Sequence, residues 1–286
     1  MNTHVHRETP RRSGCYHFGV VRLAWGTDLH LDFVDDDAVR RLASEAGAAH
    51  DAIVISGDIA SADVLEAKLT TFADAARVPV WFVLGNHDYY GSSISEVRAR
   101  MGRLGPRLTY LSHAPAPLVL EPGVAVVGVD GWGDARLGAP ERSRVVLNDF
   151  FQIADLSRHH GAALHRTLRE LGDREAEALA PRLAAALSTC RTVLVVTHVP
   201  PFREACWHEG RISDDEWLPY FTCKAVGDVL CREARARPDA RLVVVCGHTH
   251  GAGHAQIEPN LRVLTGAAEY GAPRIESLPS LGELAR

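Results

Sequence analysis

Residues 52–58 read AIVISGD, a short apolar run that ends in a glycine and an aspartate. A run of apolar and β-branched residues of this length is typical of a buried β-strand. Four other apolar runs are followed in the same way by polar residues. The five polar segments are TDLH at 27–30, GD at 57–58, GNHD at 85–88, TH at 197–198 and GHTH at 247–250. The pattern predicts five strands that carry oxygen and nitrogen ligands at their carboxyl ends.

The first three segments are spaced like β-α-β units. The separations from Asp28 to Asp58 and from Asp58 to Asn86 are 30 and 28 residues, which is the length of such a unit. We expect strands at 18–25, 52–56 and 80–84, with helices at 35–49 and 62–76 between them. Parallel strands joined by right-handed crossovers have their carboxyl ends at one sheet edge, where open α/β sheets bind ligands. The three segments are therefore expected to meet there.

The second half of the chain has shorter apolar runs separated by proline and glycine, which favours some antiparallel or edge pairing. Strands are expected at 108–111, 118–120, 124–129, 192–196 and 242–246, and helices at 159–187, interrupted near Pro181, and 224–235. We predict one α/β domain over residues 15–270, with site-covering loops at 130–155 and 199–219. A disordered N-terminus at 1–14 and a surface tail at 271–286 complete the expected organisation.

Composition narrows the class of protein. The 286 residues are 46% hydrophobic, enough for a substantial core, and the formal charge of −5 gives no general attraction to nucleic acid or anionic lipid. The six cysteines form no C-x-x-C pair, and no apolar run near the N-terminus suits a signal peptide. We expect a cytoplasmic protein with reduced thiols and no membrane span.

The ordered set of five segments resembles the calcineurin-like metallophosphoesterase superfamily. The resemblance implies a sandwich of two mixed β-sheets flanked by helices, with a dimetal site at the carboxyl ends of the strands. It assigns one metal ion to Asp28, His30 and His250, the other to Asn86, His198 and His248, and the bridging position to Asp58. Asp28 and His30, like His248 and His250, are two residues apart, so on an extended chain each pair would face one side.

The ligand chemistry agrees with this assignment. A carboxylate can bridge two ions, imidazoles and an amide complete mixed shells, and the absence of cysteine ligands argues against a structural zinc site. Two ions about 3.5–4 Å apart would share a hydroxide for in-line attack on phosphorus. This chemistry accepts Mn, Fe or Zn. The resemblance makes His87 the catalytic group that protonates the leaving oxygen, and we expect an extended turn to point it away from Asn86.

The motifs define the substrate less well than they define the metal site. Serine/threonine protein phosphatases of the superfamily carry Asp-Arg-Gly after Gly-Asp and Glu after Gly-Asn-His. Here Ile59-Ala60-Ser61 and Asp88 stand at those places, so the pattern is closer to bacterial phosphoesterases and phosphodiesterases of small molecules, including nucleotides. A nuclease is disfavoured by the acidic charge, and a non-catalytic metal-binding scaffold by the complete ligand set.

Several further residues have two interpretations. Six aromatic residues could line a substrate pocket or simply pack under loops: Tyr89, Tyr90, Trp132, Trp207, Trp217 and Tyr220. Asp130 is a weak candidate for the rim of the site. His254 is expected to start the next strand, not to bind metal. The arginines and histidines at 158–174 alternate with acidic residues, which is typical of a solvated helix face.

Overall fold

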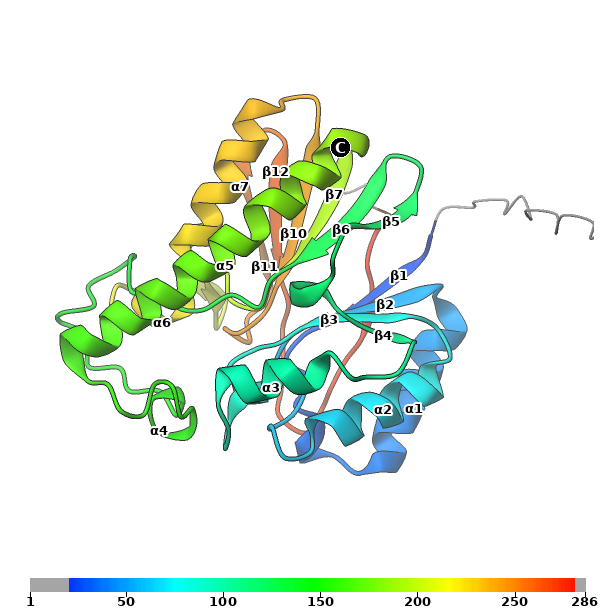
Figure 1. The fold of residues 1–286 in the computed structure, drawn as a ribbon, viewed down its shortest axis with the longest axis horizontal. Helices are drawn as coiled ribbons and strands as arrows, with labels where there is room; N and C mark the ends of the chain where they lie inside the picture. Colours follow the sequence, from blue (N-terminus) through cyan, green and yellow to red (C-terminus); the bar gives the residue numbers. More distant parts are fainter. Residues whose placement is uncertain (1–20, 281–286) are drawn as a thin grey trace, which may run out of the picture.

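A computed structural model describes residues 21–280 of the chain. Two β-sheets pack face to face, and helices cover the outer face of each sheet (Figure 1). The predicted α/β sandwich of two mixed sheets is therefore confirmed. The N-terminus predicted to be disordered, residues 1–14, lies outside the described residues.

The first sheet has the strand order β13-β1-β2-β3-β4. Its strands are β1 (Leu23–Gly26), β2 (Ala52–Ser56), β3 (Val80–Val83), β4 (Leu108–Tyr110) and β13 (Glu276–Ser277). Strands β1 to β4 are parallel, and β13, from the segment after residue 270, pairs antiparallel with β1. The helices of this half are α1 (Asp36–Ala49), α2 (Leu65–Ala76) and α3 (Ile94–Met101), with short 3-10 turns η1 (Leu31–Phe33), η2 (His87–Tyr89) and η3 (Leu111–His113). The carboxyl ends of β1, β2 and β3 share one edge, as the spacing predicts.

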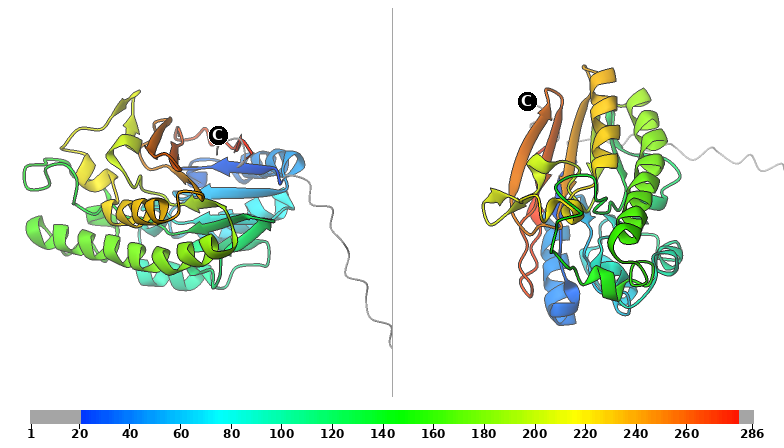
Figure 2. Two further views of the ribbon diagram at one scale, coloured as in Figure 1. Left: turned by 90° about the horizontal axis from the view of Figure 1, so that it is seen from above. Right: turned by 90° about the vertical axis from the view of Figure 1, so that its left-hand side faces the viewer.

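The second sheet has the order β11-β12-β10-β7-β6-β5. Its strands are β5 (Leu118–Glu121), β6 (Val124–Gly128), β7 (Thr192–Val196), β10 (Arg241–Cys246), β11 (Gly253–Glu258) and β12 (Leu261–Thr265). The four central strands are parallel, and β5 and β11 add antiparallel edges. Helices α5 (Gly161–Thr189) and α7 (Lys224–Ala236) lie side by side on the outer face of this sheet (Figure 2).

Strand β2 shows why the apolar runs are continuous. All its residues are buried, because a strand in the middle of this sandwich is covered on both faces. Ile53 and Ile55 pack in the cluster under α1 and α2, while Val54 packs between the sheets with Val126 and Val243. Successive side chains of β2 thus point alternately into two apolar cores, so the strand has no polar face.

Helix α5 differs from its prediction. It runs without interruption through Pro181. Pro181 cannot donate to the carbonyl of Glu177, but both residues are exposed, so that carbonyl can bond water and the helix is preserved. The side chain of Arg182 also donates to the carbonyl of Ala178, 2.9 Å away.

The two long connections contain short elements. The first holds α4 (Asp149–Gln152), and the second holds η4 (Arg203–Ala205), the hairpin of β8 (Trp207–His208) and β9 (Arg211–Ile212), and α6 (Leu218–Phe221). No helix within residues 21–280 is both long and apolar enough to cross a membrane.

Candidate metal centre

The polar segments that follow β1, β2, β3, β7 and β10 meet where the two sheets come together, and backbone hydrogen bonds join them. The amide of Asp28 donates to the carbonyl of Gly57 at 3.0 Å, and the amide of Gly247 donates to the carbonyl of His198 at 2.9 Å. Each segment is thus held by its neighbour as well as by its own strand.

The candidate ligands form two groups that share Asp58. Asp28, His30, Asp58 and His250 offer ligand atoms that all lie within 4.8 Å of one another, and so do Asp58, His198 and His248. Asn86 adjoins the second group, with its Oδ1 3.1 Å from His198 Nε2. This is the division that the resemblance implies.

The backbone reaches this geometry by left-handed turns and not by the extended chain expected around residues 28–30 and 248–250. Five of the eight described non-glycine residues with positive φ are candidate ligands: Asp28 (49°), His30 (43°), Asp58 (50°), His248 (70°) and His250 (57°). Such conformations are costly for residues with a side chain and persist where surrounding contacts enforce them. Strain of this kind concentrates at functional sites.

The aspartates also hold the backbone of the site. Asp28 accepts hydrogen bonds from the amide of His248 at 2.9 and 3.1 Å, and Asp58 accepts one from the amide of His87 at 2.9 Å. Gly85 passes so close to Asp58 that a Cβ there would lie 2.1 Å from Oδ1. Only glycine permits this approach.

Hydrogen bonds fix the orientation of two imidazoles. His198 Nδ1 lies 2.9 Å from the carbonyl of Ser56, and His248 Nε2 lies 3.1 Å from the carbonyl of Tyr220. A carbonyl only accepts, so each of these nitrogens carries a proton, and the other nitrogen of each ring is the one that a metal ion could take. Metal-ligating histidines are commonly oriented in this way.

The electrostatics favour a cation at this place. Burial alone would raise the pKa of the Asp58 carboxyl, but His198 and His87 hold that pKa well below its ordinary value. Burial disfavours the charged form of His198, yet Asp58 raises its pKa to about 10. Burial together with the nearby His198 lowers the pKa of His248 to about 3. The Asp58 carboxylate is therefore ionised and attracts positive charge.

The donor set fits a pair of metal ions. Two carboxylates, four imidazoles and one amide form mixed oxygen and nitrogen shells without thiolate, a set that Mn, Fe and Zn accept. His30 Nε2 lies 3.3 Å from His250 Nε2, and the buried His30 Nδ1 has no hydrogen-bond partner among residues 21–280. Facing nitrogens and an unpaired buried nitrogen suit coordination better than hydrogen bonding.

His87 faces a cavity beside these groups. Its side chain is 21% exposed, and its Nε2 lies 4.0 Å from Asp58 Oδ2. The expected extended turn is wrong, because Asn86 is helical (φ −65°) and His87 begins η2. The helical turn nevertheless directs the amide of Asn86 to His198 and the ring of His87 to the cavity.

Asp149 on α4 is a positioning residue that sequence reasoning missed. Its Oδ1 accepts hydrogen bonds from Asn86 Nδ2 at 2.8 Å and from the Tyr90 hydroxyl at 2.6 Å. These bonds fix the amide of Asn86 so that its oxygen faces His198. Asp149 lies 63 residues after Asn86 in an irregular segment, and no sequence signal marks it.

Asp88 and Asp130 are buried carboxylates that accept hydrogen bonds from backbone amides in or next to the polar segments. Asp88, the last residue of the third segment, is fully buried and accepts from the amides of Ile59, Ala60 and Gly85 at 2.7–2.9 Å. The sequence signal for this structural role was the position of Asp88 at the end of the segment at 85–88.

The rim position considered for Asp130 is wrong, because its side chain is 0% exposed. It accepts from the amide of Leu84 at 2.9 Å, just before the third segment, and pairs with Arg98 at 2.7 Å. Arg98 also contacts Glu175 on α5 at 2.5 Å. Asp130 therefore anchors β3, α3 and α5 to one another.

The cavity has a volume of about 430 Å³ and is lined by both long connections. Tyr90 and Trp217 line it, whereas Tyr89, Trp132 and Tyr220 are buried. Trp207 packs against Gly253, where an added Cβ would lie 2.3 Å from the tryptophan ring. His254 lies on β11 and belongs to neither ligand group.

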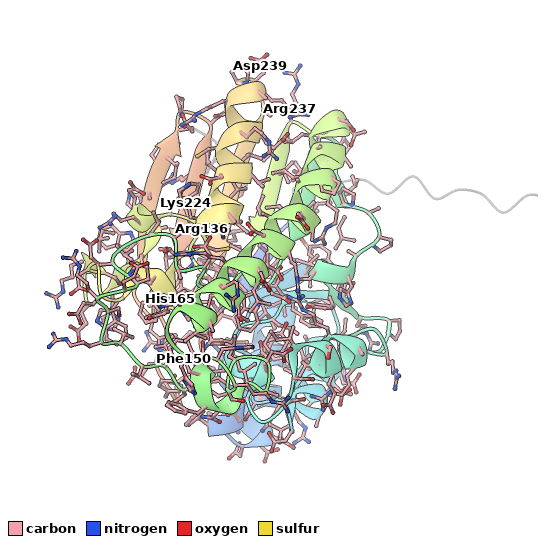
Figure 3. The ribbon with its side chains drawn as sticks, turned by 60° about the vertical axis from the view of Figure 1, so that its left-hand side comes forward. Arg136, Phe150, His165, Lys224, Arg237 and Asp239 are labelled. Atoms are coloured by element: carbon pink, nitrogen blue, oxygen red, sulfur yellow. The ribbon has the colours of Figure 1, made fainter. Side chains whose placement is uncertain are left out.

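Tyr220 links the centre to the surrounding helices. Its ring centroid lies 5.2 Å from that of Phe150, and its hydroxyl lies 3.3 Å from His165 Nε2. Figure 3 shows Phe150 on α4 and His165 on α5 along the same side of the molecule. Because the Tyr220 carbonyl binds His248, this packing helps to position a candidate ligand.

Comparison with known proteins agrees with the geometry. The model of the family described as calcineurin-like phosphoesterase matches residues 21–252. No curated protein sequence matches the chain. Among solved structures, a phosphopantetheinyl hydrolase from Mycobacterium tuberculosis is similar in fold, with 15% identity, a TM-score of 0.59 and coverage of 91% of this chain and 97% of that one. A dimetal phosphatase from Danio rerio is similar with 16% identity, a TM-score of 0.54 and coverage of 87% and 88%. With the family matched over most of its length, the chain belongs to the calcineurin-like phosphoesterases and is a hydrolase that acts on phosphoester bonds.

Proposed function

We propose that this enzyme hydrolyses a small phosphomonoester or phosphodiester, nucleotides included, with two metal ions held at the candidate centre. The observation that carries the proposal is the pair of ligand groups that share Asp58. Asp28, His30 and His250 would hold one ion, Asn86, His198 and His248 would hold the other, and Asp58 would contribute to both groups. The metals are Mn, Fe or Zn, which this donor set accepts. When bound, such ions lower the pKa of a shared water and neutralise charge on the phosphoryl oxygens.

His87 acts on the leaving group. It is the imidazole of the five segments that faces the cavity without belonging to either ligand group. Its ring packs against those of Tyr90 and His30, with centroids 4.3 and 4.7 Å away. This packing holds the imidazole where it donates a proton or hydrogen bond to the departing oxygen, an effect typically worth about 10²–10⁴ in rate.

The size and charge of the cavity favour a small substrate. Its volume of about 430 Å³ lies in the range of small-molecule sites. Arg211 is the one lysine or arginine among the described lining residues, which also include the acidic residues Asp149 and Asp214. A nuclease needs clustered basic residues along its substrate path, so the nuclease alternative is disfavoured.

The proposal is tested by loading purified protein with Mn²⁺ and measuring hydrolysis of p-nitrophenyl phosphate and bis(p-nitrophenyl) phosphate. We expect turnover of at least one ester and loss of that turnover in Asp58→Ala. Preference for the diester would identify a phosphodiesterase. Metal-loaded protein that hydrolyses neither ester, nor any other in a panel of phosphoesters, would instead support the scaffold alternative.

The role of His87 needs its own variant. His87→Ala should keep the metal content of the wild type while lowering kcat, more for poor leaving groups than for good ones. His254→Ala is the matched control, because His254 is an exposed histidine on β11 outside both ligand groups. Loss of metal from His87→Ala would show that the residue is a ligand and not a proton donor.

A further inference from the structure

A continuous aromatic surface extends from the candidate metal centre along one side of the cavity. The ring of Phe221 packs edge-on against His248, with centroids 4.7 Å apart and an interplanar angle of 80°. The ring of Trp217 lies 5.1 Å from Phe221 at 36°. Both Phe221 and Trp217 line the cavity, so this surface begins at a candidate ligand and ends at an exposed tryptophan.

The other long connection supplies apolar side chains to the same cavity. Val146 and Leu147 line it, and Val146 is 66% exposed. Ile212, from β9, adds a further apolar side chain. The cavity therefore combines polar groups at the metal centre with apolar groups from two loops, which is the usual composition of a site for an organic ligand.

Packing of the loops does not account for Trp217. Trp132, which packs in the core, is 3% exposed, whereas Trp217 is 42% exposed. Val146, Trp217 and Tyr270 are three of the six large hydrophobic residues that are exposed within residues 21–280, and all three line this cavity. Exposed apolar side chains gathered in one place mark a binding surface.

We propose that the substrate carries a planar apolar group, an aryl or heterocyclic ring, next to its phosphorus, and that this ring packs on Trp217 and Phe221. This inference rests on the proposed phosphoesterase function and specifies its substrate class. Trp217 and Phe221 line the cavity with aromatic rings, and Val146 and Leu147 supply further apolar contact. The phosphoryl group then lies toward His248 and the metal ions.

The test measures binding of three phosphonates to Mn²⁺-loaded protein by calorimetry. Methylphosphonate, phenylphosphonate and 2-naphthylphosphonate share one charged head and differ in the ring, and their C–P bonds resist hydrolysis. We expect 2-naphthylphosphonate to bind about tenfold more tightly than methylphosphonate, since ring stacking and apolar burial together contribute about that factor. Trp217→Ala should remove most of this ratio, and Trp217→Phe should keep most of it.

Phe151→Ala is the matched control, because Phe151 is 66% exposed and does not line this cavity; it should keep the full ratio. Equal affinity for the three phosphonates, or a ratio unchanged in Trp217→Ala, would overturn the inference. Hydrolysis of the p-nitrophenyl esters is measured on the same preparations. Ring preference without hydrolysis would overturn the proposed function instead, and with it the claim that the ring belongs to a substrate.

Discussion

Replacing Asp149 by alanine should weaken binding of the metal ion that Asn86 is proposed to hold. Asp149 is 6% exposed and is the carboxylate that accepts from Asn86 Nδ2, 2.8 Å away. Without it the amide can rotate, because the remaining contact of Nδ2, to the Tyr90 hydroxyl, is 3.3 Å long. The oxygen that faces His198 is then no longer held in place.

The size of the effect follows from the bond that is lost. A hydrogen bond to a charged group contributes about 1.5–3 kcal/mol, which corresponds to roughly ten- to a hundredfold in an equilibrium constant. The groups that orient metal ligands have effects of about this size on affinity. We expect Asp149→Ala to lower the affinity for the second ion by that factor and to leave the first ion, at His30 and His250, in place.

The assay is a titration of metal-free protein with Mn²⁺, followed by the signal of free Mn²⁺ in electron paramagnetic resonance. The wild type should bind two equivalents, and Asp149→Ala should bind one tightly and one weakly. Asp149→Asn keeps an accepting oxygen and should lose less. Tyr90→Phe removes the hydroxyl that donates to Asp149 and contacts Asn86 Nδ2 at 3.3 Å. It should weaken the second ion less than Asp149→Ala does, because the 2.8 Å bond from Asn86 to Asp149 remains.

Two tight equivalents in Asp149→Ala would refute the positioning role. Equal weakening of both ions would also refute it, because Asn86 is the candidate ligand to which Asp149 bonds. A comparable loss in Tyr90→Phe would show that the Tyr90 hydroxyl holds the amide as much as Asp149 does.

Three further predictions concern stability and backbone geometry. Arg98→Met leaves the buried carboxylates of Asp130 and Glu175 without their cation, and it should lower the free energy of unfolding in guanidinium titrations by about 3–5 kcal/mol. Arg22→Met removes an exposed ion pair and should not change the midpoint. Equal midpoints for both variants would contradict this prediction. Gly85→Ala should abolish metal binding, as measured by elemental analysis, because the added Cβ would collide with Asp58. Gly105→Ala should bind metal normally, because a Cβ added there would have no atom within 4 Å. Chelation should lower the Tm, because ions bind only the folded state, and an unchanged Tm would mean that the centre is empty in the purified protein.

The arrangement of strands was predictable because it depends on local patterns. The apolar runs before Asp58 and Asn86 mark strands, and their spacing places both at one sheet edge whatever the details of packing. The types of the candidate ligands were readable for the same reason: carboxylate, amide and imidazole side chains stand directly after those runs. Both features survive errors of one or two residues in an element boundary.

The backbone conformation of the ligands was not predictable from the chain alone. Asp28 and His30 are left-handed because their amides bond to the carbonyls of Gly57 and Asp58, and those partners come from the next segment along the sheet. The continuation of α5 through Pro181 was likewise not predictable from the chain alone. A proline normally interrupts a helix, and only its position on the exposed face of α5 explains why it does not.

Asp28 and Asp58 have two roles that depend on each other. Each carboxylate faces the candidate metal centre and also accepts a backbone amide, from His248 and His87 respectively. The amides belong to residues that are themselves proposed to act at the centre, His248 as a ligand and His87 on the leaving group. Binding of ions at this centre would therefore be coupled to the conformation of the segments through the same two carboxylates. This coupling explains how strained, left-handed residues can be retained: their cost is offset by bonds that exist only when all five segments are in place.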